Sequence, residues 1–315
     1  MKLILRIVGV FLVACVVFAF AGVFATWAPD RTVKELSARW AVAPSQFIPV
    51  LGMEVHVRDE GARDDPFPIV LLHGTSASLH TWDGWAQALK GERRVVRFDL
   101  PAFGLTGPSS DNDYSIAAYV RFVTAVLDKL GVQRCVLAGN SLGGQIAWAT
   151  AAALPQRVQQ LVLVDAAGYP MQSQSIPIAF RIARTPGLRA LMEQILPRGI
   201  VESSVRNVYG DPAKVTPALV DRYYDLALRA GNRPALAHRL NQGLSADALT
   251  IKSLKVPTLI LWGAKDRLIP LENGQRFAAD IAGSKLVVFD SLGHVPHEED
   301  AKATVDVVKI FLGKP

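Results

Sequence analysis

A serine lies in the short pattern Gly139-Asn140-Ser141-Leu142-Gly143, the stretch of this chain best suited to do chemistry. Small residues two positions before and two after a serine relieve crowding where a strand turns abruptly into a helix. The hydroxyl of Ser141 would then point into open space, beside unpaired N–H groups at the helix start. The pattern predicts that Ser141 is a nucleophile. The structural alternative is a glycine-flanked turn with a capping serine.

A nucleophilic serine needs a base within hydrogen-bonding reach and a third group that fixes the tautomer of that base. Of the six histidines, His294 follows the last predicted strand and is the best candidate for the base. His297 is a nearby alternative, although its acidic neighbours suggest a solvated helix start, and His73 more simply shapes a turn. Asp266, just after a predicted strand, is the expected orienting acid. Asp165, after the preceding strand, is its rival.

Backbone donors for a developing oxyanion come from a second segment. Gly74 follows a predicted strand and would let the backbone approach a reacting carbonyl group. The N–H of Thr75 could therefore join that of Leu142 as an oxyanion donor, and Ser76 is a less favoured donor. Removing one such donor typically costs about a hundredfold to a thousandfold in rate.

Apolar runs alternate with helix-like segments and predict the elements that position these residues. A hairpin is expected first, followed by repeated strand–helix units whose unbroken apolar strands favour a parallel sheet with helices on both faces. We expect an α/β fold with a mostly parallel, doubly wound sheet of about eight strands. Ligands of such sheets bind beyond the carboxyl ends of the strands, the edge that would carry Ser141, Asp266 and His294. The predicted strands are residues 46–50, 53–57, 69–72, 95–98, 135–138, 158–164, 258–262 and 285–289.

The strand pattern breaks in the second half of the chain. Residues 168–253 contain no convincing strand and instead hold helix-compatible pieces punctuated by prolines. We interpret this interval as an inserted helical cap on a core formed by residues 45–167 and 254–315. Apolar residues in such a cap more often pack together than contact a ligand, so they do not reveal a substrate.

Composition limits the classes of partner. The chain has 315 residues, is 50% hydrophobic and carries a formal net charge of +6. The basic residues are scattered, which gives nucleic-acid binding little support. Cys135 lies in a predicted buried strand, where an inert side chain is expected. No cofactor and no metal site are predicted, and the oligomeric state is left open.

The N-terminal segment, residues 1–30, is predicted to be a membrane anchor. The run from Ile7 to Ala28 is uncharged and apolar, and its length in a helix matches a hydrocarbon core of roughly 30 Å. Lys2 and Arg6 precede it and favour a cytoplasmic N-terminus, with an extracytoplasmic catalytic domain on the periplasmic side if the source is bacterial. A cleaved signal peptide and lipidation at Cys15 are the alternatives.

Taken together, these segments resemble a capped serine hydrolase of the α/β-hydrolase superfamily, from about Phe47 to Leu312. The resemblance implies a cofactor-free serine mechanism. Epoxide hydrolases and haloalkane dehalogenases of this superfamily have aspartate where this chain has Ser141, which argues against those two activities. Ala102 and Thr106 are mild departures from the family pattern. The segments that carry the resemblance are His73-Gly74, Asp99 to Gly104, Gly139 to Gly143, Asp266 and Gly293-His294.

The expected function is therefore a membrane-anchored serine esterase with a lipase-like reaction and a small-molecule ester or acyl substrate. Ser141 would attack the carbonyl carbon to form an acyl-enzyme, with His294 moving the proton and Asp266 orienting His294. Gly139-Asn140-Ser141 also looks like the corresponding segment of hydrolases that cleave carbon–carbon bonds in ring-fission products of aromatic compounds, which is the alternative. A non-catalytic binding protein on the same fold is a third possibility.

Overall fold

The protein is described by a computed structural model that covers residues 26–170, 172–185, 194–242 and 248–313, together with isolated positions 6, 7, 9, 10, 22, 24 and 187. Its centre is an eight-stranded sheet with the order β1-β2-β4-β3-β5-β6-β7-β8. The β1–β2 and β2–β4 pairs are antiparallel and every other neighbouring pair is parallel. The predicted mostly parallel sheet of about eight strands is thus confirmed. The strands are β1 (Gln46–Val50), β2 (Met53–Glu60), β3 (Ile69–Leu72), β4 (Val95–Phe98), β5 (Cys135–Asn140), β6 (Val158–Val164), β7 (Thr258–Gly263) and β8 (Lys285–Phe289).

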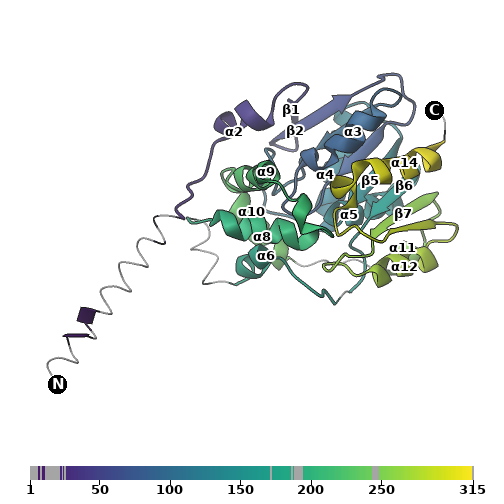
Figure 1. Cartoon of the computed structure of the whole chain (residues 1–315). Coiled ribbons are helices and arrows are strands. Elements are labelled where there is room, and N and C mark those ends of the chain that lie inside the picture. Colours follow the sequence, from purple (N-terminus) through teal and green to yellow (C-terminus); the bar gives the residue numbers. More distant parts are fainter. Residues whose placement is uncertain are drawn as a thin grey trace.

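Helices cover both faces of the sheet because its central strands are apolar on both sides (Figure 1). Alternate residues of β3 divide between two cores: Val70 and Leu72 pack in one, and Ile69 and Leu71 in the other. The first core includes side chains of α4 (Ile116–Lys129), α5 (Leu142–Ala153) and α12 (Leu271–Asp280). The second includes side chains of α3 (Asp83–Leu89) and α14 (Ala301–Leu312).

The chain between β6 and β7 forms helices and, within the described residues, adds no strand to the sheet. Four of them, α6, α8, α9 and α10, gather at one side of the molecule in Figure 1, whereas α11 lies beside α12. Their apolar residues build a small core of their own, which includes Val201, Val205 and Val220 and takes in Val295 from the segment after β8. The exact limits 168–253 of the cap remain a prediction. The helices are α6 (Ile178–Ala183), α8 (Arg198–Val208), α9 (Pro217–Ala227), α10 (Asn232–Asn241) and α11 (Ala248–Lys252).

The N-terminal prediction needs correction. A single membrane span requires a helix of about 20 apolar residues, and within the described part of the chain no helix is long and apolar enough to cross a bilayer. Much of the run predicted as the anchor lies outside the described residues. Its end belongs to the folded domain, because the Ala28 N–H donates to the Gln194 carbonyl at 3.1 Å and Ala28 is buried among cap residues. The single-pass anchor and the extracytoplasmic placement are therefore set aside.

Candidate active site

The turn between β5 and α5 has the strained form that the sequence pattern predicts. Ser141 has φ 55° and ψ −117°, a left-handed conformation that is costly for a residue with a side chain. The flanking glycines are required by contact: a Cβ atom on Gly139 would collide with the Gly143 carbonyl, and one on Gly143 would collide with the Leu72 carbonyl. The helix α5 begins directly after Ser141, so its first amides surround the serine.

His294 and Asp266 meet at the carboxyl edge of the sheet. The Nδ1 atom of His294 lies 2.7 Å from Oδ2 of Asp266, and both side chains are buried. The other oxygen, Oδ1, accepts the backbone N–H groups of Leu268 at 2.8 Å and Ile269 at 2.9 Å. With Nδ1–H donating to the carboxylate, Nε2 is left as the nitrogen that can accept a proton.

Backbone approach at Gly74 brings the predicted oxyanion segment against the serine. A Cβ atom at Gly74 would lie 2.9 Å from the Asn140 side-chain oxygen and 3.1 Å from the Ser141 Cβ. Thr75 and Leu142 line the same pocket as Ser141 and His294. Within the described residues, neither the Thr75 N–H nor the Leu142 N–H donates a backbone hydrogen bond. Both amides are thus available to a carbonyl oxygen bound at Ser141.

Asn140 joins the serine strand to the histidine segment, a role that the sequence reasoning missed. Its side-chain Nδ2 donates to the Val164 carbonyl at 3.1 Å and to the His294 carbonyl at 2.9 Å. The asparagine before the serine was noted only as a likeness to other hydrolases. Its physical reason is that one buried amide ties β5, β6 and the segment after β8 together.

The two alternative histidines are both placed away from proton transfer at the serine. His73 is buried, its Nδ1 lies 2.8 Å from the Gly74 carbonyl and its Nε2 accepts the Leu100 N–H at 2.9 Å, so it shapes the turn as expected. Burial lowers its pKa and favours the neutral ring. His297 was expected at a solvated helix start, but it is only 1% exposed and its ring centroid lies 3.9 Å from that of Trp82. That part of the prediction was wrong.

Of the acidic residues beside His297, Glu299 is buried, and the cap binds its carboxylate. Oε2 of Glu299 accepts the N–H groups of Gly210 and Gly293, each at 2.9 Å, and Oε1 accepts that of Asp211 at 2.8 Å. The His294 N–H also donates to the Val208 carbonyl at 2.8 Å. The segment that carries His294 is therefore joined to the end of α8 by hydrogen bonds.

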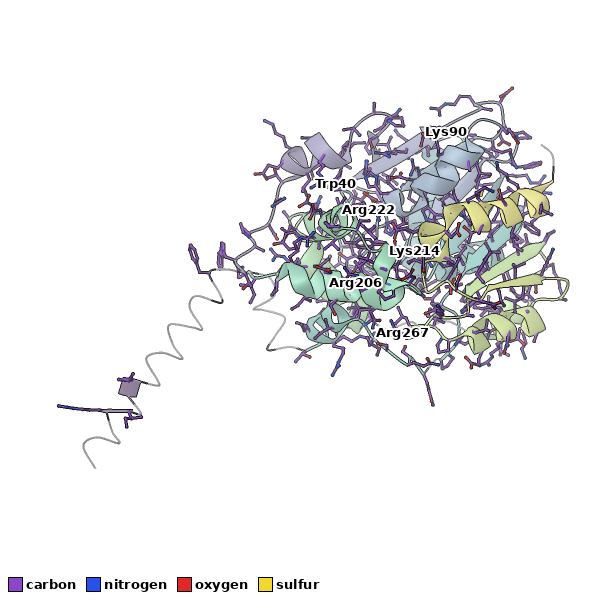
Figure 2. The ribbon with its side chains drawn as sticks, viewed as in Figure 1. Trp40, Lys90, Arg206, Lys214, Arg222 and Arg267 are labelled. Atoms are coloured by element: carbon purple, nitrogen blue, oxygen red, sulfur yellow. The ribbon has the colours of Figure 1, made fainter. Side chains whose placement is uncertain are left out.

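A second attachment joins the same segment to α9. Glu298 forms an ion pair with Arg222 and accepts a hydrogen bond from the Tyr223 hydroxyl at 2.9 Å. Figure 2 shows Arg222 and Lys214 where the cap helices meet the core, and Lys214 Nζ lies 3.4 Å from the Glu299 carbonyl. A run of acidic residues after a histidine gives no local signal of such contacts, because their partners lie about 80 residues earlier in the chain.

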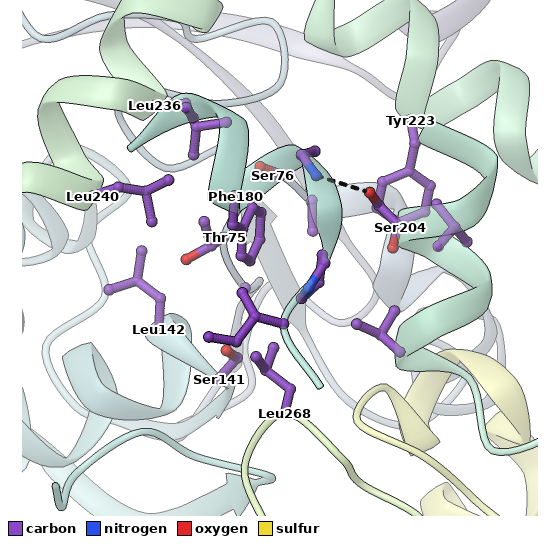
Figure 3. Close-up of a pocket in the computed structure, with 18 of the residues that line it drawn as sticks. Thr75, Ser76, Ser141, Leu142, Phe180, Ser204, Tyr223, Leu236, Leu240 and Leu268 are labelled. Carbon is purple, nitrogen blue, oxygen red and sulfur yellow. Dashed lines mark hydrogen bonds between the residues drawn. The ribbon is translucent and has the colours of Figure 1, made fainter. Parts of the chain in front are cut away.

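A pocket of about 450 Å³ opens over Ser141. Figure 3 shows Ser141, Leu142 and Leu268 at its core side, with the side chains of the cap above them. Most of the cap residues that line it are apolar, and three are arginines. The cap residues that line the pocket include Phe180, Ser204, Val205, Tyr223, Leu236, Leu240, Arg184, Arg233 and Arg239.

Asp165, the rival acid, ends β6 and is fully buried. Its Oδ1 accepts the Gly263 N–H at 3.0 Å. Within the described residues, Asp165, Asp266 and His294 form a group whose possible metal-ligand atoms lie within 4.8 Å of one another. The Nδ1 atom of His294 bears the hydrogen that bonds to Asp266, so it offers no lone pair to an ion. The arrangement therefore favours proton transfer by the His294 ring, with Asp266 placed to orient that ring.

Comparison with known proteins identifies the family. A family model described as the alpha/beta hydrolase fold matches residues 68–301. A 2-hydroxy-6-oxo-2,4-heptadienoate hydrolase from Pseudomonas putida is 31% identical over 278 residues, covering 83% of this chain and 93% of its own.

Solved structures agree with this assignment. A meta-cleavage product hydrolase from Pseudomonas fluorescens IP01 has a TM-score of 0.73 and 25% identity, covering 85% of this chain and 97% of its own. A structure described as a membrane phospholipase A and a bacterial virulence factor has the same TM-score and identity, covering 99% of this chain and 98% of its own. The chain therefore belongs to the alpha/beta hydrolase fold family, and it is a hydrolase.

Proposed function

We propose that this hydrolase cleaves a carbon–carbon bond in 2-hydroxy-6-oxo-dienoate products of aromatic ring fission, with Ser141 as nucleophile, His294 as base and Asp266 as orienting acid. The observation that carries the proposal is the similarity to the dienoate hydrolase, which extends over 83% of the chain. The family alone would not support this choice, since one fold serves many reactions. The earlier preference for carboxylic esters becomes the second candidate.

The substrate class fits the chemistry of the site. The proton of the 2-hydroxyl group must first move to C5, which leaves a C2 carbonyl group that can accept the electron pair of the breaking C5–C6 bond. Ser141 Oγ then attacks the C6 carbonyl carbon, and its proton passes to His294 Nε2. The N–H groups of Thr75 and Leu142 would hold the oxyanion. Collapse breaks the C5–C6 bond and releases a dienolate, which takes the proton from His294. Water that is deprotonated by His294 then attacks the acyl group on Ser141, which releases an acid as Ser141 regains its proton.

The charge of the pocket also supports an anionic substrate. A dienoate carries a carboxylate, which needs a cationic partner when it leaves water. Arg239 of α10 and Arg184 after α6 line the pocket from the cap, as does Arg233, which also forms an ion pair with Asp30. Burial lowers the pKa of the Arg239 guanidinium, and an anion bound beside it would favour its charged form.

A direct test compares two substrate types on the same preparation. The purified chain is given a 2-hydroxy-6-oxo-dienoate and, separately, p-nitrophenyl esters of increasing acyl length, with Ser141→Ala as the control. The proposal expects a higher kcat/KM for the dienoate, followed by loss of the dienolate absorbance, and no turnover by the control. Rapid ester cleavage without dienoate cleavage would overturn it.

Ester cleavage is the second candidate, because the structure described as a membrane phospholipase A covers 99% of this chain. The largely apolar cap residues around Ser141 would suit an acyl chain. The attack at Ser141 is the same in both reactions, but an ester expels an alkoxide and needs no prior proton transfer to carbon. The ester arm of the same experiment tests this candidate.

A further inference from the structure

Two buried carboxyl groups share the space behind the base. Asp165 comes from the end of β6, and Asp266 from the segment after β7. They are 0% and 3% exposed, and their oxygens belong to the group of atoms that lie within 4.8 Å of one another. Two carboxylates this close and removed from water are not both ionised, so the pair shares one proton.

Hydrogen-bond partners decide which carboxyl group keeps the proton. Asp266 accepts three donors, from His294 Nδ1, the Leu268 N–H and the Ile269 N–H. Asp165 accepts only the Gly263 N–H on Oδ1, and within the described residues its Oδ2 meets no donor. Three donors stabilise a carboxylate, whereas an oxygen without a donor suits a hydroxyl. The proton therefore resides on Oδ2 of Asp165.

Electrostatics and backbone geometry agree with this assignment. Burial, and after it the charge of Asp266, raise the pKa of Asp165 well above its usual range, and a hydrogen bond with Asp266 and the charge of Glu299 act in the same direction. Asp165 also has φ 44°, a left-handed conformation that costs energy outside glycine.

We propose that Asp165 is a neutral positioning residue that donates a hydrogen bond from Oδ2 to the Asp266 carboxylate, and that it becomes a reserve acid for His294 when the charge of Asp266 is removed. The inference rests on the proposed roles of Ser141, His294 and Asp266. In the native protein the bond holds the Asp266 carboxylate in place against the His294 ring. No covalent bond changes, and the single proton of the pair stays on Asp165.

Three variants separate this role from simple packing. In Asp165→Asn the amide can still donate to Asp266 and accept from Gly263, and asparagine tolerates the left-handed backbone. We expect its rate to stay within about threefold of the native rate, since one neutral donor replaces another. Asp266→Asn should lose a large factor, up to about 10⁴ as in other triads. The double variant should lose at least a further tenfold relative to Asp266→Asn, because the reserve acid is gone.

The pH dependence of the rate distinguishes a reserve acid at Asp165 from a purely structural residue. In Asp266→Asn the repulsion from Asp266 is absent, and the groups that still face Asp165 are His294 and Glu299. Activity of this variant then requires ionised Asp165, so its rate should rise as the pH rises through the pKa of Asp165. The double variant should lack this rise. A purely structural Asp165 predicts instead that both profiles have the same shape and that the two losses simply multiply.

The rate of fluorophosphonate labelling of Ser141 is the readout, because it does not depend on the natural substrate. Failure of the dienoate proposal would then leave the native protein labelled and the test of Asp165 intact. Infrared spectroscopy gives an independent arm: a carboxylic-acid carbonyl band should persist at neutral pH in the native protein and vanish in Asp165→Asn. Absence of that band from the native protein would overturn the proposal. If Asp165→Asn does not fold, the pH-dependent rise in Asp266→Asn remains decisive.

Discussion

The carboxyl edge of the sheet and the cap that covers it contribute to the site in different ways. At the edge, the backbone fixes each functional group: a strained turn at Ser141, a glycine at Gly74, and backbone donors on Asp266. In the cap, side chains such as Phe180 and Leu240 contribute surface and volume to the pocket. We therefore expect the reaction step to depend on local backbone geometry and the choice of substrate to depend on how the cap helices pack.

The two regions are not independent, because His294, the proposed base, contacts both of them. His294 bonds to Asp266 through its ring, and through its N–H to the Val208 carbonyl at the end of α8. Glu299 binds Gly293 on the core side and Gly210 on the cap side. A change in the cap can therefore act on turnover through the position of the base, as well as on substrate binding.

The largest effect is expected at the edge. Ser141→Ala removes the nucleophile and should lower kcat by a factor of about 10⁴ to 10⁶, as in other enzymes with this constellation. The variant should still fold, since alanine lacks only the hydroxyl oxygen of serine and adds no atoms to the turn. Steady-state kinetics with the better of the two substrate types, together with circular dichroism, checks both statements. A folded variant with native turnover would remove Ser141 from the mechanism.

Glu299→Gln tests the connection between the two regions. The glutamine amide can accept hydrogen bonds at only one of the two positions now occupied by oxygens, so at least one buried N–H loses its acceptor. We expect kcat to fall roughly tenfold to a hundredfold, because small misplacements of a catalytic group carry such a cost. The free energy of unfolding should drop by about 1–3 kcal/mol.

The control for this variant is Glu54→Gln on the exposed face of β2. It removes the same charge far from the base and should leave kcat unchanged. Equal kcat values for native protein and Glu299→Gln, measured under saturating substrate, would show that the base segment keeps its position without the cap.

The buried histidine His297 is expected to make the stability of the fold sensitive to acid. Burial lowers the pKa of His297 far below its usual range, while the unfolded chain binds a proton near pH 6.5. As the pH falls below about 6.5, the unfolded state gains that proton and the folded state does not. The free energy of unfolding should then fall by up to about 1.4 kcal/mol per pH unit for this residue.

His297→Phe should keep the stacking on Trp82 and remove this share of the acid sensitivity. Urea unfolding of both proteins between pH 5 and 7 measures it. His73 contributes in the same direction and is unchanged in the variant. Parallel losses of stability in the two proteins would mean that His297 is protonated in the folded state.

The smallest effect is expected in the cap. Leu240→Phe adds bulk to the pocket and should raise KM for the longest substrates by about three- to tenfold, since a methylene group in a pocket is worth about 1–3 kcal/mol. Fluorophosphonate labelling of Ser141 by a small probe should be unchanged. Ile310→Phe on the exposed side of α14 is the matched control. A large loss of labelling in Leu240→Phe would contradict the view that this cap residue affects substrate binding and not the reactivity of Ser141.

The residues at the carboxyl edge of the sheet could be predicted from the sequence because the patterns that indicate them are local. The Gly139 to Gly143 pattern and the residues just after β7 and β8 each follow an apolar strand, and parallel strands end at one edge. The contacts of Asn140 with His294, and of Glu299 with Gly210, join distant parts of the chain and leave no such pattern.

Two predictions were wrong because they concern segments whose contacts come from distant parts of the chain. The acidic neighbours of His297 indicated solvent, yet Trp82 and the cap bury the segment. At the N-terminus, apolar length indicated a membrane span, but a hydropathy pattern does not show that Ala28 pairs with Gln194. Both cases concern segments whose surroundings are built from residues remote in sequence.

The central claim is that Ser141 is activated by His294 and Asp266 for covalent catalysis. Its most direct test is peptide mapping by mass spectrometry after brief exposure of the native protein to a fluorophosphonate probe. We expect one adduct per chain, on the peptide that contains Ser141, and none in Ser141→Ala. A correctly folded native protein that remains unlabelled, or that is labelled at another residue, would contradict it.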